Sequence, residues 1–295
     1  MICRGGIVSG SSSERSASPW FRSMLAPSVT PLDALQQRAR PVHWPMALAG
    51  VALVAILLTV LPHRTDIAPL IESDYAYLLT AADRLHDGLG PTATPPVAPG
   101  QPWNWQGDWA FLTQWPIGYP VMIASVRTVF STSTIAACRA ISIIACAAAL
   151  VGWFLWTWRT APPGLARLLL ALAAAASSVS VASLANPSTD VLLVAALPWI
   201  LLCVIQAVTR LNHGDQTHAD RGATAWLIVA GLMAGGLCWV RYGSIFIAPA
   251  IVAYLLYERF ARRRLGSRHI VSFVIAAALP VLAIMSVNRA WGAGA

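Results

Sequence analysis

A pair of carboxylates, Glu72 and Asp74, marks the first part of the sequence that could do chemistry. Ser73 and Asp74 are residue types that cap helices, and the residues after them repeat apolar positions at helical spacing. The dipole of such a helix favours an ionised carboxylate at its N-terminus. We therefore expect an ionised Asp74, able to take part in proton transfer, although a helix cap alone is the simpler interpretation. The apolar side of this amphipathic helix is formed by Leu78, Ala82, Leu85 and Leu89.

Aromatic residues crowd the sequence that follows, in the stretches 103–109 and 115–120. Tryptophan and tyrosine at this density are typical of the headgroup layer of a membrane. Their flat faces also suit the C–H faces of a sugar, and the side chains of Asn104 and Asp108 could bond sugar hydroxyls. Composition alone leaves both interpretations open.

The elements that position these residues must lie in a membrane. The chain of 295 residues is 57% hydrophobic and only 11% charged, which is too little polar surface to coat a soluble protein of this size. All 20 basic residues are arginine and occur in short groups between apolar runs, so the pI near 9.8 reflects membrane topology and not nucleic-acid binding. The cysteines have no metal-ligand or disulfide spacing, and we predict no metal site.

The apolar runs predict an all-α, polytopic membrane protein, because a helix needs about 20 apolar residues to cross a bilayer. An eighth run, 117–130, is short and contains Gly118, Pro120 and Arg127. The orientation of the segments on either side leaves it no full crossing of its own, so we expect an interfacial or re-entrant helix there. The seven predicted spans are 44–61, 135–158, 166–185, 191–208, 224–240, 244–257 and 270–287.

Orientation follows from the arginines, since the segments rich in basic residues stay in the cytoplasm. The densest group, 259–268, fixes one side as cytoplasmic, and counting back places the acidic loop 63–116 on the outer side. We expect a disordered cytoplasmic tail at 1–43 and a multi-pass domain at 44–295 in the cytoplasmic (inner) membrane, with the active-site loop on the outer face.

Several short motifs together resemble the GT-C membrane glycosyltransferases. They are the acidic pair after the first span, a Pro-x-Gly-Tyr-Pro element at 116–120, the sequence Asn-Pro-Ser-Thr-Asp at 186–190, and a glycine-rich helix leading to Arg241 and Tyr242. Within that class the chain is most similar to the dolichyl-phosphate-mannose protein mannosyltransferase and aminoarabinose transferase group. The resemblance implies a GT-C-like helical bundle whose first outer loop holds the catalytic aspartate.

The resemblance also implies roles for individual residues. Asp74 would be the general base that activates the acceptor hydroxyl, with Glu72 as the alternative. Arg241 would neutralise the phosphate of a polyprenyl-phosphate sugar donor, or else extend to the lipid headgroups. The other residues expected to bind substrate are Trp105, Asp108, Tyr119, Asp190 and Tyr242; for Asp190 a helix cap is the alternative.

The expected partners are membrane lipid and the polyprenyl-phosphate sugar, without nucleic acid and without a cofactor. GT-C enzymes of this group usually have more membrane helices than this sequence offers, so we expect 44–295 to be an incomplete GT-C domain of a C-terminally truncated chain. The alternatives are a non-catalytic transporter or envelope-assembly protein, and an inactive truncated glycosyltransferase. A transporter would place charges near the middle of its spans, whereas here they collect in one loop and at span ends.

Overall fold

A computed structural model of the chain describes residues 73–93, 110–112, 115–162, 164, 167–174, 189–213, 216–263 and 265–292. The chain divides into two units, Met1–Ala39 and Arg40–Ala295, and the described residues all belong to the second. The tail at 1–43 and the span at 44–61 therefore lie outside the described residues.

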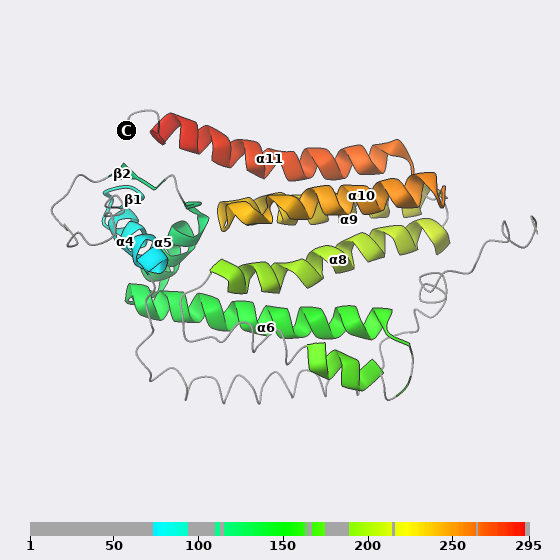
Figure 1. The fold of residues 1–295 in the computed structure, drawn as a ribbon, viewed down its shortest axis with the longest axis horizontal. Helices are drawn as coiled ribbons and strands as arrows, with labels where there is room; N and C mark the ends of the chain where they lie inside the picture. Colours follow the sequence, from blue (N-terminus) through cyan, green and yellow to red (C-terminus); the bar gives the residue numbers. More distant parts are fainter. Residues whose placement is uncertain are drawn as a thin grey trace, which may run out of the picture. The chain divides into compact units, whose positions relative to one another are not determined.

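Five long helices within the described residues are apolar enough to cross a membrane (Figure 1). Each corresponds to a predicted span, and the span at 166–185 is described only as a helix over 167–174. The prediction of an all-α polytopic membrane protein is confirmed. Three of the five are α6 (Thr134–Thr160), α8 (Thr189–His213) and α11 (Ser267–Gly292). The other two are α9 (Gln216–Gly236) continued by the 3-10 turn η2 (Leu237–Trp239), and the 3-10 turn η3 (Tyr242–Phe246) continued by α10 (Ile247–Phe260).

Helix α9 is the centre of the bundle, since it packs between α8 and α11. Close approach is possible because Gly231 and Gly235 face α11: a Cβ on either would lie within 3.0 Å of the backbone of Phe273 or Ala277. The two residues form a Gly-x-x-x-Gly pair, a motif that lets membrane helices pack closely. On the other side of α8, Gly152 of α6 lies against Pro198 and Trp199.

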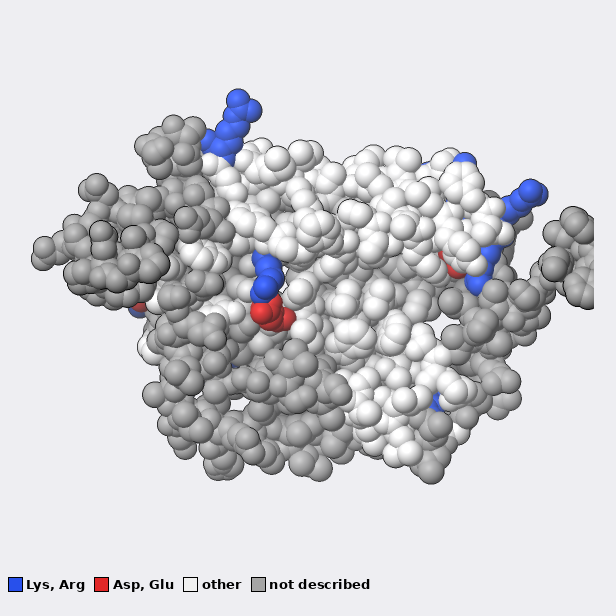
Figure 2. All heavy atoms as spheres, viewed as in Figure 1, with Lys and Arg blue, Asp and Glu red and all other residues white. Residues whose placement is uncertain are grey.

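Helices α6 and α8 run in the same direction, as do α9 and α11, whereas α8 and α9 run in opposite directions (Figure 1). Polar groups collect at the two ends of this bundle. At one end, Arg159 of α6 donates to Gln206 of α8 at 3.2 Å, and His269 of α11 lies 2.9 Å from Asp220 of α9. In Figure 2, coloured charged groups lie toward the ends of the described surface, and the surface between them is mostly white. This pattern suits helices that cross an apolar layer.

Two shorter helices pack together beside the start of α6. They are α4 (Ser73–His86) and α5 (Gly118–Phe130), and a two-residue antiparallel pair, β1 (Thr92–Ala93) and β2 (Ala110–Phe111), lies next to α4. With 13 residues, α5 is about 20 Å long, shorter than the apolar core of a bilayer. This length agrees with the prediction that 117–130 makes no independent crossing.

Candidate functional site

The first turn of α4 is the place where the sequence predicts the catalytic carboxylate. The helix begins at Ser73, so Asp74 lies in its first turn, where the helix dipole favours a negative charge. The structure describes the backbone of Asp74 and not its side chain, and Glu72 lies outside the described residues. The helix ends at His86, before Gly88, whose φ of +77° suits glycine. Leu89, which the sequence pattern placed on the apolar side of this helix, lies beyond its end and is exposed.

Helices α4 and α5 run in the same direction, and this fixes where the first turn of α4 lies. At their N-terminal ends, the rings of Tyr77 and Trp115 stack with centroids 5.3 Å apart. At their C-terminal ends, Asp83 accepts a hydrogen bond from Arg127, and His86 lies 3.1 Å from the Thr128 hydroxyl. Asp74 is one turn before Tyr77, so it lies at the end of α4 that adjoins the start of α5.

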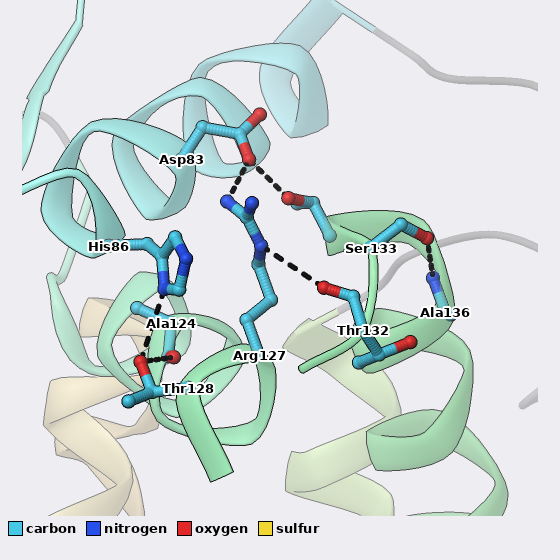
Figure 3. A network of polar contacts seen from close by, with 9 residues as sticks. Asp83, His86, Ala124, Arg127, Thr128, Thr132, Ser133 and Ala136 are labelled. Atoms are coloured by element: carbon cyan, nitrogen blue, oxygen red, sulfur yellow. Dashed lines mark hydrogen bonds and ion pairs between the residues drawn. The ribbon is translucent and has the colours of Figure 1, made fainter. Parts of the chain in front are cut away.

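A polar network connects the C-terminal ends of α4 and α5 to the start of α6 (Figure 3). The Asp83 carboxylate accepts from both the Arg127 guanidinium and the Thr134 hydroxyl, so it bridges α5 and α6. Arg127 also reaches the carbonyl oxygen of Thr132 at 3.4 Å, and Ser133 caps α6 by accepting from the Ala136 amide at 3.2 Å. The network holds α4 at a fixed position through contacts that do not involve Asp74.

Three of the predicted substrate-binding residues meet at the same end of the bundle. Arg241, between η2 and η3, donates to Asp190 at the N-terminus of α8, and both side chains are about half exposed. The next residue, Tyr242, accepts a hydrogen bond of 2.7 Å from the amide of Asn288 on α11. Asn288 was missed by the sequence analysis, because a single asparagine near a helix end gives no recognisable signal.

The start of α5 lies directly against this cluster. A Cβ on Gly118 would lie within 3.0 Å of the backbone carbonyl of Trp239, two residues before Arg241. Trp239 is held in turn by a 2.8 Å hydrogen bond from its indole nitrogen to the carbonyl oxygen of Pro280 in α11. Gly118 therefore connects the N-terminal end of α4 and α5 to the turn that carries Arg241 and Tyr242.

Tyr119 lies in a different environment from the one the sequence suggests. Its side chain is completely buried among α4, α5 and α6, and its hydroxyl lies 2.8 Å from the Cys138 thiol. Burial raises the pKa of the Tyr119 phenol well above its usual range, and the nearby Cys138 adds to this. In the structure Tyr119 is thus a neutral packing residue, so we leave it out of the proposed site.

Two further predicted residues, Trp105 and Asp108, lie outside the described residues. Within the part of the chain that the structure describes, no group of three or more His, Cys, Asp or Glu side chains could hold a metal ion. What the described geometry does offer is a half-exposed guanidinium beside a carboxylate and a phenol. These groups are suited to binding phosphate and hydroxyl groups.

The fold and the polar cluster define a multi-pass helical membrane protein with a polar site at one end of its bundle. The family model described as dolichyl-phosphate-mannose-protein mannosyltransferase matches residues 114–291, more than half of the chain. The chain therefore belongs to this family of GT-C membrane glycosyltransferases, which confirms the resemblance seen in the sequence. No curated protein and no solved structure gives a significant match.

Proposed function

We propose that the protein transfers a sugar from a polyprenyl-phosphate carrier to a hydroxyl acceptor on the outer side of the cytoplasmic membrane. The observation that supports this most is the parallel packing of α4 and α5. Through Tyr77, Trp115 and Gly118 it brings the first turn of α4 toward the turn that holds Arg241. The transfer requires a carboxylate that can accept a proton and a cation that can stabilise the leaving phosphate, close to the same substrate.

In the proposed reaction, Asp74 takes the proton of the acceptor hydroxyl as that oxygen attacks the anomeric carbon of the donor sugar. The bond between the anomeric carbon and the phosphate oxygen breaks, and the electron pair leaves with the polyprenyl phosphate. Arg241 stabilises the negative charge that develops on this phosphate. Asp190 holds the Arg241 side chain in place before the donor binds, and Tyr242 and Asp108 contribute hydrogen bonds to the sugar or acceptor.

The distribution of charge supports an enzyme over a transporter. Within the described spans, ionisable acidic and basic side chains lie in the first or last two turns of each helix, as with Asp190 and Arg210 in α8. Transporters place such groups near the middle of their spans, often beside broken helices. The proposed orientation, with the arginine-rich end cytoplasmic, puts the first turn of α4 on the outer side.

The test measures sugar transfer by membranes that contain the Asp74→Asn variant. The donor is polyprenyl-phosphate mannose whose mannose is radiolabelled. Loss of the general base should lower the transfer rate by about 100-fold or more. The matched control is Asp87→Asn, which removes an exposed carboxylate just after the end of α4 and should leave transfer within about twofold. If Asp74→Asn is correctly inserted and transfers sugar at the wild-type rate, Asp74 has no part in the mechanism.

A further inference from the structure

Arg139, in the second turn of α6, differs from most of the other arginines at its end of the bundle. In the described residues, Arg84 donates to Thr92 at 2.6 Å, Arg127 pairs with Asp83, and Arg241 pairs with Asp190. The Nε atom of Arg139 is buried, and within the described part of the chain it donates to no acceptor. The side chain as a whole is half-buried.

A buried guanidinium donor without an acceptor is energetically unfavourable, because the group loses its hydrogen bonds to water and gains none in return. The cost is greater inside a membrane span, where arginines are rare and either pair with another polar group or line a pathway for substrate or ions. Arg139 lies within the span Thr134–Thr160. The described residues thus offer the Arg139 Nε no acceptor, and a negatively charged ligand would supply one.

The neighbours of Arg139 place it in the region of the proposed site. The preceding residue, Cys138, contacts the hydroxyl of Tyr119, and Tyr119 is close enough to Tyr75 for the two phenols to interact electrostatically. Tyr75 directly follows Asp74 in the first turn of α4. The backbone of Arg139 thus lies next to the buried contact that joins α6 to α5 and, through Tyr75, to the first turn of α4.

The direction of the Arg139 side chain follows from the period of the helix. Seven residues further along α6, Cys146 lies on the same face and packs in a cluster with Val191 and Ala195 of α8. Arg139 is about 10 Å nearer the end of the bundle than Cys146. It therefore projects on the side of the α8 N-terminus, where Asp190 and Arg241 form their ion pair.

We propose that Arg139 binds the phosphate of the lipid-linked sugar donor, and that Arg241 with its paired Asp190 completes the binding of the leaving group. The inference rests on the proposed function, and it assigns the ground-state contact with the donor to a residue of α6. Arginine suits this role because its planar guanidinium can donate two parallel hydrogen bonds to a phosphate. Ordinary phospholipid headgroups also carry a phosphate, so the experiment must distinguish binding of the polyprenyl phosphate from binding of a phospholipid.

The test measures binding of undecaprenyl phosphate to the full chain, purified in a maltoside detergent, by the change in tryptophan fluorescence. Arg139→Gln should weaken binding at least tenfold. Arg139→Lys, which keeps the charge and loses the two-pronged geometry, should weaken it less. The control is Arg289→Gln, an exposed arginine near the end of α11, which should bind within twofold of wild type.

Three outcomes would overturn the inference. They are wild-type affinity in Arg139→Gln, an equal loss of affinity in Arg289→Gln, and competition by phosphatidylglycerol as strong as that by undecaprenyl phosphate. Undecaprenol, which lacks the phosphate, should bind equally to wild type and Arg139→Gln. If Arg139→Gln fails to fold, Arg139→Lys is compared with wild type, and equal affinity of these two proteins for undecaprenyl phosphate would overturn the inference.

Sugar transfer is measured separately, so the two proposals can fail independently. A wild-type chain that binds undecaprenyl phosphate through Arg139 and transfers no sugar would contradict the proposed function alone. Active transfer that depends on Asp74, with unchanged phosphate binding in the Arg139 variants, would contradict only the role of Arg139.

Discussion

The α-carbon of Gly118 lies so close to the backbone of Trp239 that no side chain fits between them. The two residues are far apart in the sequence, yet this contact joins the start of α5 to the turn before Arg241. Because α5 also packs against α4, the contact connects α4 to the turn that carries Arg241 and Tyr242.

Replacing Gly118 with alanine should therefore displace α5 from Trp239. Inserting a methyl group into such a contact costs about 1–3 kcal/mol of unfolding free energy. We expect Gly118→Ala to lower the thermal midpoint in detergent and to reduce the rate of sugar transfer. The control is Gly236→Ala, since a Cβ at Gly236 meets nothing within 4 Å. Equal effects of the two variants would show that the contact has no specific role.

The contact of α9 with α11 gives a second prediction. A Cβ on Gly235 would lie within 3.0 Å of the Ala277 backbone, whereas its neighbour Gly236 faces open space. Gly235→Val should thus destabilise the protein by at least about 1–3 kcal/mol, measured as the loss of folded protein on heating in detergent. Gly236→Val makes the same substitution one residue away and should lower the free energy of unfolding much less.

A buried ion pair at the arginine-rich end of the bundle gives a third prediction. Glu258 is fully buried, and its carboxylate lies 3.3 Å from the guanidinium of Arg262 one turn later. Glu258→Ala would leave Arg262 buried without this carboxylate, at a cost of about 3–5 kcal/mol in unfolding free energy.

The double variant Glu258→Leu with Arg262→Met removes both charges and should recover most of that loss. Chemical unfolding of the three proteins in detergent makes the comparison. If the double variant is as unstable as the single one, the pair does not act as a unit.

Tyr119 gives a prediction about pH. Burial raises the pKa of its phenol above the usual 10.0, so the unfolded chain releases this proton at a lower pH than the folded chain does. The stability that Tyr119 contributes is complete below about pH 10 and falls as the pH rises further. The chain has no lysine, and the other side chains that titrate in this range, five tyrosines and five cysteines, are the same in wild type and in a variant of Tyr119.

In Tyr119→Phe, stability at neutral pH should fall by about 0.5–1.5 kcal/mol, because the contact with Cys138 is lost. Between pH 9 and pH 11, the thermal midpoint of wild type should fall more steeply than that of the variant. Parallel curves for the two proteins would mean that the phenol ionises at its ordinary pKa in the folded state.

The sequence by itself determined the membrane helices and the family. Apolar runs of this length have one stable solution in lipid, a helix with all of its backbone hydrogen bonds satisfied internally, so 135–158 and 270–287 became α6 and α11 nearly as predicted. The helix starting at Ser73 and its end before Gly88 were also predictable, because caps and glycine act over a few residues.

The choice of partners was decided only by the tertiary structure. Asp190 and Arg241 were each expected to bind substrate, but nothing in their local sequence says that they pair with each other across α8 and the turn after α9. The burial of Tyr119 and the unpaired Nε of Arg139 also depend on how helices from distant parts of the chain pack. Helix formation depends on local backbone and solvent energetics, whereas the environment of a side chain depends on which surfaces meet.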